Sequence, residues 1–391
     1  MGETGTFIFY ISVITLSAFL SKCAYRKKNY KYKNTIVFCV VLLLAIVAGI
    51  RYEVGSDWFQ YYMAPEWFDI DGIRGGTKGN YEIGYKAIAY IIRSLGLGGS
   101  VFLFVYAFIT YYFLFKVIDK FADRINVFTA VFMYGCLYYL VSFNITRQAL
   151  SISVAMYAIT QLKVTTIKED GSKETLLGLF KQNMRFVIYT FIAFLFHKGG
   201  IIVFIALPVC YFMRKRNAIR LGMLLVLVLG IMNFRMFTGL AIQIMGSTDF
   251  QWYFIANKGG DGSWLKFVLR YLPFLFGIWL SYKSLIKDQK MYDMYNLALL
   301  GIIINSLSLV IATDIERIGY PFLYFLVIVT GFAMKSSNCN RIVPLIKIRV
   351  PLVLYKMYRI FLYLFMLWTM WYIFFLQGSY QVVPYQTIFG R

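Results

Sequence analysis

Arg51-Tyr52-Glu53-Val54-Gly55-Ser56-Asp57 is the stretch at which a long apolar run meets charged residues. The apolar run extends from Thr35 to Ile50, and a polar, aromatic and glycine-containing segment continues after it to about Gly99. Apolar runs of such length are typical of membrane-spanning helices. The stretch therefore predicts a helix that leaves a membrane, with the segment 52–99 on the face where the helix emerges.

The composition of the whole chain indicates a membrane protein. Of its 391 residues, 60% are hydrophobic and only 15% are charged, whereas about 25% are charged in a soluble domain. In lipid, each backbone polar group must be satisfied within its own helix. We predict an all-α polytopic integral membrane protein with one membrane domain over 1–391 and about twelve transmembrane or re-entrant helices. The spans are expected near 5–21, 35–51, 99–116, 126–142, 145–163, 183–197, 200–213, 219–238, 264–282, 291–311, 317–334 and 353–376.

The basic residues predict the orientation of these helices. The net charge is +22, and 24 of the 40 Lys and Arg residues fall in alternate loops that would share one side of the membrane. Positively charged loops stay on the cytoplasmic side, so this distribution explains the charge without nucleic acid as a partner. The segment 22–34 carries six basic residues after the first apolar run. This order is opposite to that of a cleavable signal peptide, and it predicts an uncleaved first helix with an outside N-terminus.

Two features are expected on the outer face besides the segment 52–99. Lys181 and Arg214 both favour the cytoplasm, although only about thirty residues separate them, which predicts a short hairpin at 183–213 with its tip at His197-Lys198-Gly199-Gly200. Non-helical backbone at that depth is tolerated only inside the protein or beside a watery cavity. Within 52–99, Tyr85 to Leu97 is apolar but too short to span, and we interpret it as an interfacial helix. An outer loop is expected at about 239–263.

Arginines at the outer ends of the predicted helices suggest an anion site. Arginine presents a planar, always charged fork that suits phosphate, and several forks at one depth suit a pyrophosphate at the headgroup level. The alternative is snorkelling or pairing with a nearby carboxylate. The four residues in question are Arg51, Arg147, Arg270 and Arg317.

Three candidate acid–base groups lie on the same face. Asp57 and Glu82 each stand among glycine and aromatic residues, as a sugar site would require, and His197 is the single histidine of the chain. A multi-histidine metal site is thereby excluded, the five cysteines form no metal-binding spacing, and we expect no cofactor. Asp69-Ile70-Asp71 resembles the acidic pair with which nucleotide-sugar transferases hold a metal ion. This interpretation is disfavoured, because the pair is expected on the outer face, where nucleotide sugars are absent. Asn144-Ile145-Thr146 matches a glycosylation acceptor, and we expect Asn144 and Thr146 to cap the following helix instead.

The ordered set of motifs resembles the EpsG-like branch of Wzy-type polysaccharide polymerases. The matching elements, which run from about 40 to 330, are Arg51-Tyr-Glu-Val-Gly55-Ser-Asp57 with Tyr61, Glu82-Ile-Gly84-Tyr85, Asn144-Ile-Thr-Arg147-Gln148, Phe196-His197-Lys198, and Arg317-Ile-Gly-Tyr320 with Tyr324. Departures from the family pattern are Ser56, where Thr is commoner, and the pair Gly199-Gly200.

The resemblance implies a glycosyltransferase of the bacterial cytoplasmic membrane whose active site faces the exterior. Such proteins join oligosaccharide units carried on undecaprenyl pyrophosphate, alongside chain-length regulators and flippases. Arginines would stabilise the leaving pyrophosphate without a metal, and Asp57, Glu82 or His197 would serve the acceptor hydroxyl. We favour a carboxylate as the base, with His197 positioning the substrate. The resemblance assigns sugar contacts to Tyr61, Tyr85, Asn144, Gln148, Tyr320 and Tyr324.

Three other classes remain open at this point. An O-antigen ligase shares the lipid-linked donor but usually has one large outer loop late in the chain, whereas here the larger outer segment is early. A membrane O-acyltransferase can use a lone histidine but needs no set of outer arginines. A transporter is expected to contain internal repeats, and we find none in the sequence.

Overall fold

A computed structural model of the chain describes residues 1–26, 31–68, 81–164, 178, 181–215, 264–308, 315–338 and 349–390, with the side chains of 214, 215, 264–268, 307, 308, 315 and 316 excepted. Across these residues the protein is helical and contains no strand. The one β-type contact there is an isolated bridge between Arg51 and Thr387. The all-α prediction is therefore confirmed.

The helices follow the predicted apolar runs closely. The α-helices are α1 (Glu3–Ala24), α2 (Lys33–Gly49), α3 (Trp58–Tyr62), α4 (Ala64–Trp67), α6 (Ile83–Ser94), α7 (Gly99–Phe121), α8 (Val127–Tyr134), α9 (Thr146–Thr160), α11 (Met184–Phe196), α12 (Ala206–Lys215), α16 (Trp264–Leu280), α17 (Tyr282–Leu285), α18 (Gln289–Ser308), α19 (Ile315–Leu323), α20 (Phe325–Ala333) and α21 (Leu352–Trp371). The π-helical turns are Gly135–Tyr139 and Tyr372–Leu376, and the 3-10 helices are Val141–Phe143, Lys198–Ile205 and Ser379–Gln381.

Several helices have the length and composition of membrane spans. Three helical segments, Glu3–Ala24, Gly99–Phe121 and Leu352–Leu376, are long and apolar enough to cross a membrane, and shorter apolar helices accompany them. On α21 the side chains of Val353, Ile360, Leu364 and Trp368 are exposed. An apolar helix face of this extent is stable against lipid rather than water. The protein is thus a helical membrane protein, and the expected number of twelve spans stays a prediction because 219–238 and the loop 239–263 lie outside the described residues.

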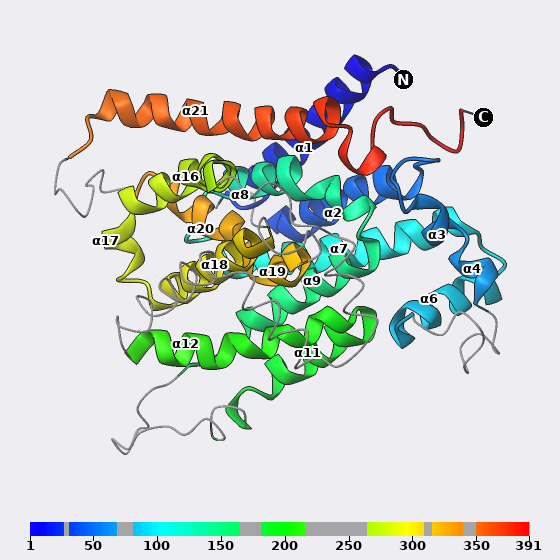
Figure 1. The fold of residues 1–391 in the computed structure, drawn as a ribbon, viewed down its shortest axis with the longest axis horizontal. Helices are drawn as coiled ribbons and strands as arrows, with labels where there is room; N and C mark the ends of the chain where they lie inside the picture. The colour runs from blue at the N-terminus through cyan, green and yellow to red at the C-terminus, as the bar shows by residue number, and fades with distance from the viewer. Residues whose placement is uncertain are drawn as a thin grey trace.

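The bundle has two opposite ends, which differ in the segments that lie there. In Figure 1 α3, α4, α6 and the two chain termini lie towards the right, and α17 lies on the left. We call the α17 end the basic end, because the described basic segments 116–124 and 283–290 adjoin it, and the other end the site end. At the basic end, ion pairs join Lys33 to Asp119 and Arg124 to Asp288, each at 2.8 Å.

The hairpin expected at 183–213 forms around a break at His197. The first arm is α11, and the second arm is the 3-10 helix Lys198–Ile205 continued by α12. A 3-10 helix rises about 2 Å per residue rather than 1.5 Å, so the second arm reaches about 30 Å, the thickness of a bilayer core. The second arm is therefore longer than expected, because we predicted a short hairpin whose arms do not cross a bilayer.

Gly200 allows the two arms to approach closely. A Cβ atom at this position would lie 2.7 Å from Ser151 Oγ and 2.8 Å from the carbonyl carbon of Ala193. The Ser151 hydroxyl donates to the Ala193 carbonyl oxygen at 2.8 Å, which ties α9 to the end of α11. The glycine pair therefore has a packing reason at its second position.

We predict that Gly200→Ala lowers the thermal unfolding temperature of the purified protein. The added methyl group overpacks a contact between backbones, which costs about 1–3 kcal/mol. The control is Gly5→Ala in α1, where the nearest atom to a new Cβ lies at an ordinary 3.7 Å. An unchanged unfolding temperature for Gly200→Ala in detergent would contradict this packing.

The C-terminal segment closes the site end of the bundle. Tyr385 donates to the Val47 carbonyl oxygen at 2.8 Å, and its N–H donates to Thr6 Oγ1 at 3.0 Å. Tyr10 donates to the Val382 carbonyl oxygen at 2.9 Å. Residues near both termini therefore pack together around the end of α2, where the segment that begins at Arg51 emerges.

Candidate functional site

Asn144 holds the segment Gly55-Ser56-Asp57 in place. Its side-chain oxygen accepts hydrogen bonds from the Ser56 hydroxyl at 3.0 Å and the Asp57 N–H at 3.2 Å, and its amide nitrogen donates to the Tyr380 carbonyl oxygen at 3.0 Å. Gly55 has a φ of +107°, and a Cβ there would lie 3.0 Å from the Asn144 side-chain oxygen. Only glycine adopts this backbone without strain, so the glycine brings the first motif against the third.

The expectation that Asn144 and Thr146 cap the following helix is wrong. The N-cap of α9 is Ile145, and no side chain caps it. The Thr146 hydroxyl instead donates back to the Phe143 carbonyl oxygen at 3.1 Å. Asn144 does not cap the helix because Ser56 and Asp57 occupy its side-chain oxygen, and its amide nitrogen donates to Tyr380.

Arg147 and Glu82 form the central ion pair of the site. Arg147 Nη1 donates to Glu82 Oε2 at 2.5 Å. The guanidinium also lies over the rings of Tyr81 and Tyr85, at 4.6 and 5.3 Å from their centres. The Arg147 side chain is 24% exposed and that of Glu82 is 8% exposed, so the cation remains accessible while its carboxylate partner is covered.

Glu82 also links α6 to the tip of the hairpin. Its Oε1 accepts a hydrogen bond from the Lys198 N–H at 3.1 Å. A Cβ at Gly84, two residues on, would lie 2.7 Å from the Leu195 carbonyl oxygen. This close approach of α6 and α11 brings the second and fourth motifs together. Lys198 is exposed and pairs with no carboxylate among the described residues, and the sequence did not single it out as an anion ligand.

His197 is held in one tautomer by the backbone. Its Nδ1 accepts a hydrogen bond from the Gly199 N–H at 3.1 Å. The proton of a neutral ring therefore sits on Nε2, which leaves that atom as a donor. Burial lowers the pKa of His197, and the charges of Arg147, Arg317 and Lys198 lower it further, against the opposing effect of Glu82. The neutral, Nε2-protonated form is thus favoured at neutral pH.

Tyr61 connects Arg147 with the first motif. Its phenol donates to the Asn144 carbonyl oxygen at 2.9 Å and accepts a hydrogen bond from Arg147. Burial raises the pKa of Tyr61 to about 12; the charges of Arg147 and Arg317 lower it, and that of Asp57 raises it. All three charges therefore lie near one phenol. The Asp57 carboxylate is half-buried and makes no ion pair among the described residues.

Arg317 enters the same group from α19. Gln148 Nε2 donates to the Arg317 carbonyl oxygen at 2.8 Å, which fixes α19 against α9. The Arg317 side chain is exposed, and its charge acts on both His197 and Tyr61. The site thus gathers all five motifs singled out in the sequence. The residues gathered are Asp57, Tyr61, Glu82, Tyr85, Asn144, Arg147, Gln148, His197, Lys198 and Arg317.

Arg51 is at the site end but is not brought into this group. Its guanidinium is buried, donates to the carbonyl oxygens of Ala48 at 2.6 Å and Phe143 at 2.9 Å, and lies 4.5 Å from the centre of the Phe143 ring. Trp58 Nε1 donates to the Arg51 carbonyl oxygen at 3.0 Å. These contacts use the arginine to join α2, α3 and the turn before α9.

Arg270 lies among aromatic residues. It is 5.7 Å from the centre of the Tyr271 ring, and its charge acts on Tyr138. Tyr138 stacks on Tyr324 with ring centres 3.9 Å apart, and Tyr320 lies 5.7 Å from Tyr324. The two tyrosines of the last motif are buried and face this aromatic group. Asp69 and Asp71 lie outside the described residues.

Comparison with known proteins agrees with the family resemblance. A model described as the EpsG family matches residues 34–387. No curated protein and no solved structure matches the chain. The matched range includes every motif gathered at the site. The chain belongs to the EpsG family, the family of Wzy-type polysaccharide polymerases.

Proposed function

We propose that the protein polymerises oligosaccharide repeat units carried on undecaprenyl pyrophosphate, at the outer leaflet of the bacterial cytoplasmic membrane. The observation that carries the proposal is the convergence of Arg147, Lys198 and Arg317 at one end of the bundle. A diphosphate ester leaves with its negative charge, so its departure needs stabilising cations more than a proton donor. Cations fixed before the reaction supply this stabilisation.

The contacts at the site suggest different parts for the three acid–base candidates. Both oxygens of Glu82 accept hydrogen bonds, from Arg147 and Lys198, so Glu82 positions the cation. His197 presents Nε2–H and therefore donates a hydrogen bond to substrate. Of the two candidate carboxylates, Asp57 makes no ion pair within the described residues, and we assign it the role of base.

The reaction then proceeds by one displacement. Asp57 accepts the proton of the acceptor hydroxyl, whose oxygen forms a bond to the anomeric carbon of the growing chain. The bond from that carbon to the pyrophosphate oxygen breaks, and undecaprenyl pyrophosphate leaves against Arg147, Arg317 and Lys198. Tyr61 and Tyr85 are buried and contact Arg147, so in this proposal they hold the cation in place rather than touch the sugar. Arg51 has a structural part in this proposal.

Deletion of the protein followed by analysis of glycan length tests the proposed function. Loss of a polymerase leaves single repeat units on the surface. Loss of a ligase or a flippase leaves no units there, and loss of an acyltransferase leaves chains of normal length without acyl esters. Either of the last two outcomes would exclude polymerisation as the activity.

The pH dependence of polymerisation tests the role of His197. Since the pKa of His197 is lowered, the working neutral form persists as pH falls to the ordinary histidine value of about 6.5. Polymerisation is expected to be constant down to that pH and to fall below it, where protonation of Nδ1 breaks the bond from Gly199. His197→Gln, which keeps an N–H donor, is expected to retain activity and to lose this acid limb, whereas His197→Ala is inactive. A fall that begins above pH 7 in purified protein would contradict the assignment.

A further inference from the structure

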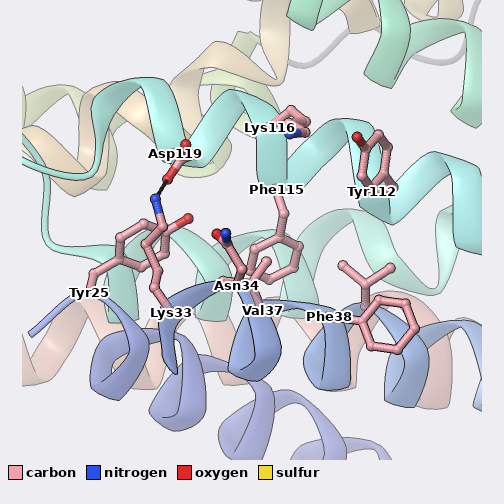
Figure 2. A pocket seen from close by; sticks show the side chains of 10 residues that line it. Tyr25, Lys33, Asn34, Val37, Phe38, Tyr112, Phe115, Lys116 and Asp119 are labelled. Carbon is pink, nitrogen blue, oxygen red and sulfur yellow. Dashed lines mark hydrogen bonds and ion pairs between the residues drawn. The ribbon is translucent and has the colours of Figure 1, made fainter. Parts of the chain in front are cut away.

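A cavity of ≈ 200 Å³ lies far from the candidate site, between α2 and α7 at the basic end of the bundle. Figure 2 shows its lining, which includes Lys33 and Asn34 from the start of α2 and Lys116 and Asp119 from the end of α7. None of these residues takes part in the site described above. The cavity therefore calls for a different ligand.

The polar and apolar parts of the lining are separated along α2. Lys33, Asn34 and Asp119 line one end of the cavity, and Val37 and Phe38 lie about one turn further along α2, whereas Lys116 lies next to Phe115 on α7. Phe38 is 53% exposed, so the wall opens to the surroundings of the bundle. A ligand with a polar head and an apolar tail fits this order.

The charges of the cavity select an anionic head. Asp119 accepts a hydrogen bond from Lys33 at 2.8 Å and another from the Tyr25 phenol, so its charge is compensated. Lys116 lies 5.2 Å from the centre of the Tyr112 ring and pairs with no carboxylate in the described part of the chain. One cation is left over in the same cavity as the N-terminus of α2, which no side chain caps. The positive end of a helix dipole adds to the attraction for an anion.

We propose that this cavity binds the headgroup and upper acyl chain of an anionic phospholipid. The basic loops place this end of the bundle at the cytoplasmic leaflet, whose anionic lipids are recognised by basic pockets between helices. Asn34 is exposed and adds a hydrogen-bond donor beside the phosphate. A free phosphate or a soluble anion leaves the wall of Val37 and Phe115 without a partner.

Lipid retention by the purified full-length protein tests this site. Native mass spectrometry from detergent compares phosphatidylglycerol with phosphatidylethanolamine of the same acyl chains. The wild type is expected to retain phosphatidylglycerol preferentially, and Lys116→Gln to weaken its retention about fivefold, as the loss of one basic contact predicts. The matched control is Lys287→Gln, an exposed lysine at the same end but outside the cavity.

A second variant tests the apolar wall. Val37→Phe fills the cavity while keeping every charge, and it is expected to reduce phosphatidylglycerol retention as well, which decides the question if Lys116→Gln does not fold. Equal retention of the two lipids by the wild type overturns the proposal. Unchanged retention in a folded variant also overturns it, as does displacement of the lipid by soluble glycerol phosphate. These results do not depend on polymerase activity.

Discussion

Replacing Arg147 with glutamine is expected to lower the rate of polymer formation about 10²–10³-fold, the effect of removing one preorganised group that stabilises developing negative charge. The substitution removes the cation that lies over Tyr81 and Tyr85 and leaves the covered Glu82 carboxylate without its ion-pair partner. Arg147→Lys is expected to recover only part of the loss, because an ammonium group cannot reproduce the planar fork. The rate is measured as polymer length against time in cells that express each variant at equal level.

Arg93→Gln is the matched control for this experiment. Arg93 is an exposed arginine at the site end, and its guanidinium donates to the Glu66 carbonyl oxygen at 2.8 Å rather than to a residue of the site. It is expected to leave polymer length unchanged. If Arg147→Gln made full-length polymer, the proposed role of Arg147 in stabilising the leaving pyrophosphate would be wrong.

Replacing Asp57 with asparagine is expected to reduce polymerisation about 10²–10⁴-fold, the usual contribution of a general base. The change is nearly isosteric, and the Asp57 N–H keeps its bond to Asn144, so the segment stays in place. The Asp57 side chain makes no capping bond to α3, and thus no cap is lost. The measurement is the release of undecaprenyl pyrophosphate by purified protein.

Two comparisons make the Asp57 result specific. Glu53→Gln removes a carboxylate from the same segment, and Glu53 is exposed, so it should release undecaprenyl pyrophosphate at the wild-type rate. Glu82→Gln should lose less activity than Asp57→Asn, since glutamine still accepts a hydrogen bond from Lys198 or Arg147. If Asp57→Asn kept its activity and Glu82→Gln lost it, the roles of base and positioning residue would be exchanged.

The helices could be predicted from the sequence because apolar runs in a membrane protein have few alternatives. Backbone groups in lipid must be satisfied within a helix, so the runs at Glu3–Ala24 and Gly99–Phe121 appear close to their predicted places. The break at His197 was also predicted, from the distance between Lys181 and Arg214. The length of the second arm was not, because hydropathy does not distinguish a 3-10 helix from an α-helix.

The site could be predicted only in part, because its contacts join segments that are far apart in the chain. The order of the motifs singled out Arg147, Glu82 and His197, which the structure brings together. The same pattern could not show that Arg51 is buried against carbonyl groups. An arginine at a helix end gives the same sequence pattern whether it binds carbonyl groups or an anionic substrate. Nor could it show that Asn144 binds the first motif instead of capping a helix.

Lys198 shows a different limit of the sequence. A lysine beside a lone histidine carries no signal of its own, and its place at the site depends on the Glu82 carboxylate that accepts its N–H. The close approach of Asn144 to Gly55, whose φ is +107°, is likewise a contact between segments far apart in the chain. Contacts of this kind become visible only when the helices are packed.

Purified protein in lipid nanodiscs, given one undecaprenyl-pyrophosphate-linked repeat unit and no metal ion or nucleotide sugar, tests the central claim most directly. The measurement is the size distribution of lipid-linked glycan together with the undecaprenyl pyrophosphate released. We expect a ladder of repeat units, with one lipid carrier released for each new linkage. Folded protein that leaves the unit at its original length, or that lengthens it only when a nucleotide sugar is added, would contradict the account.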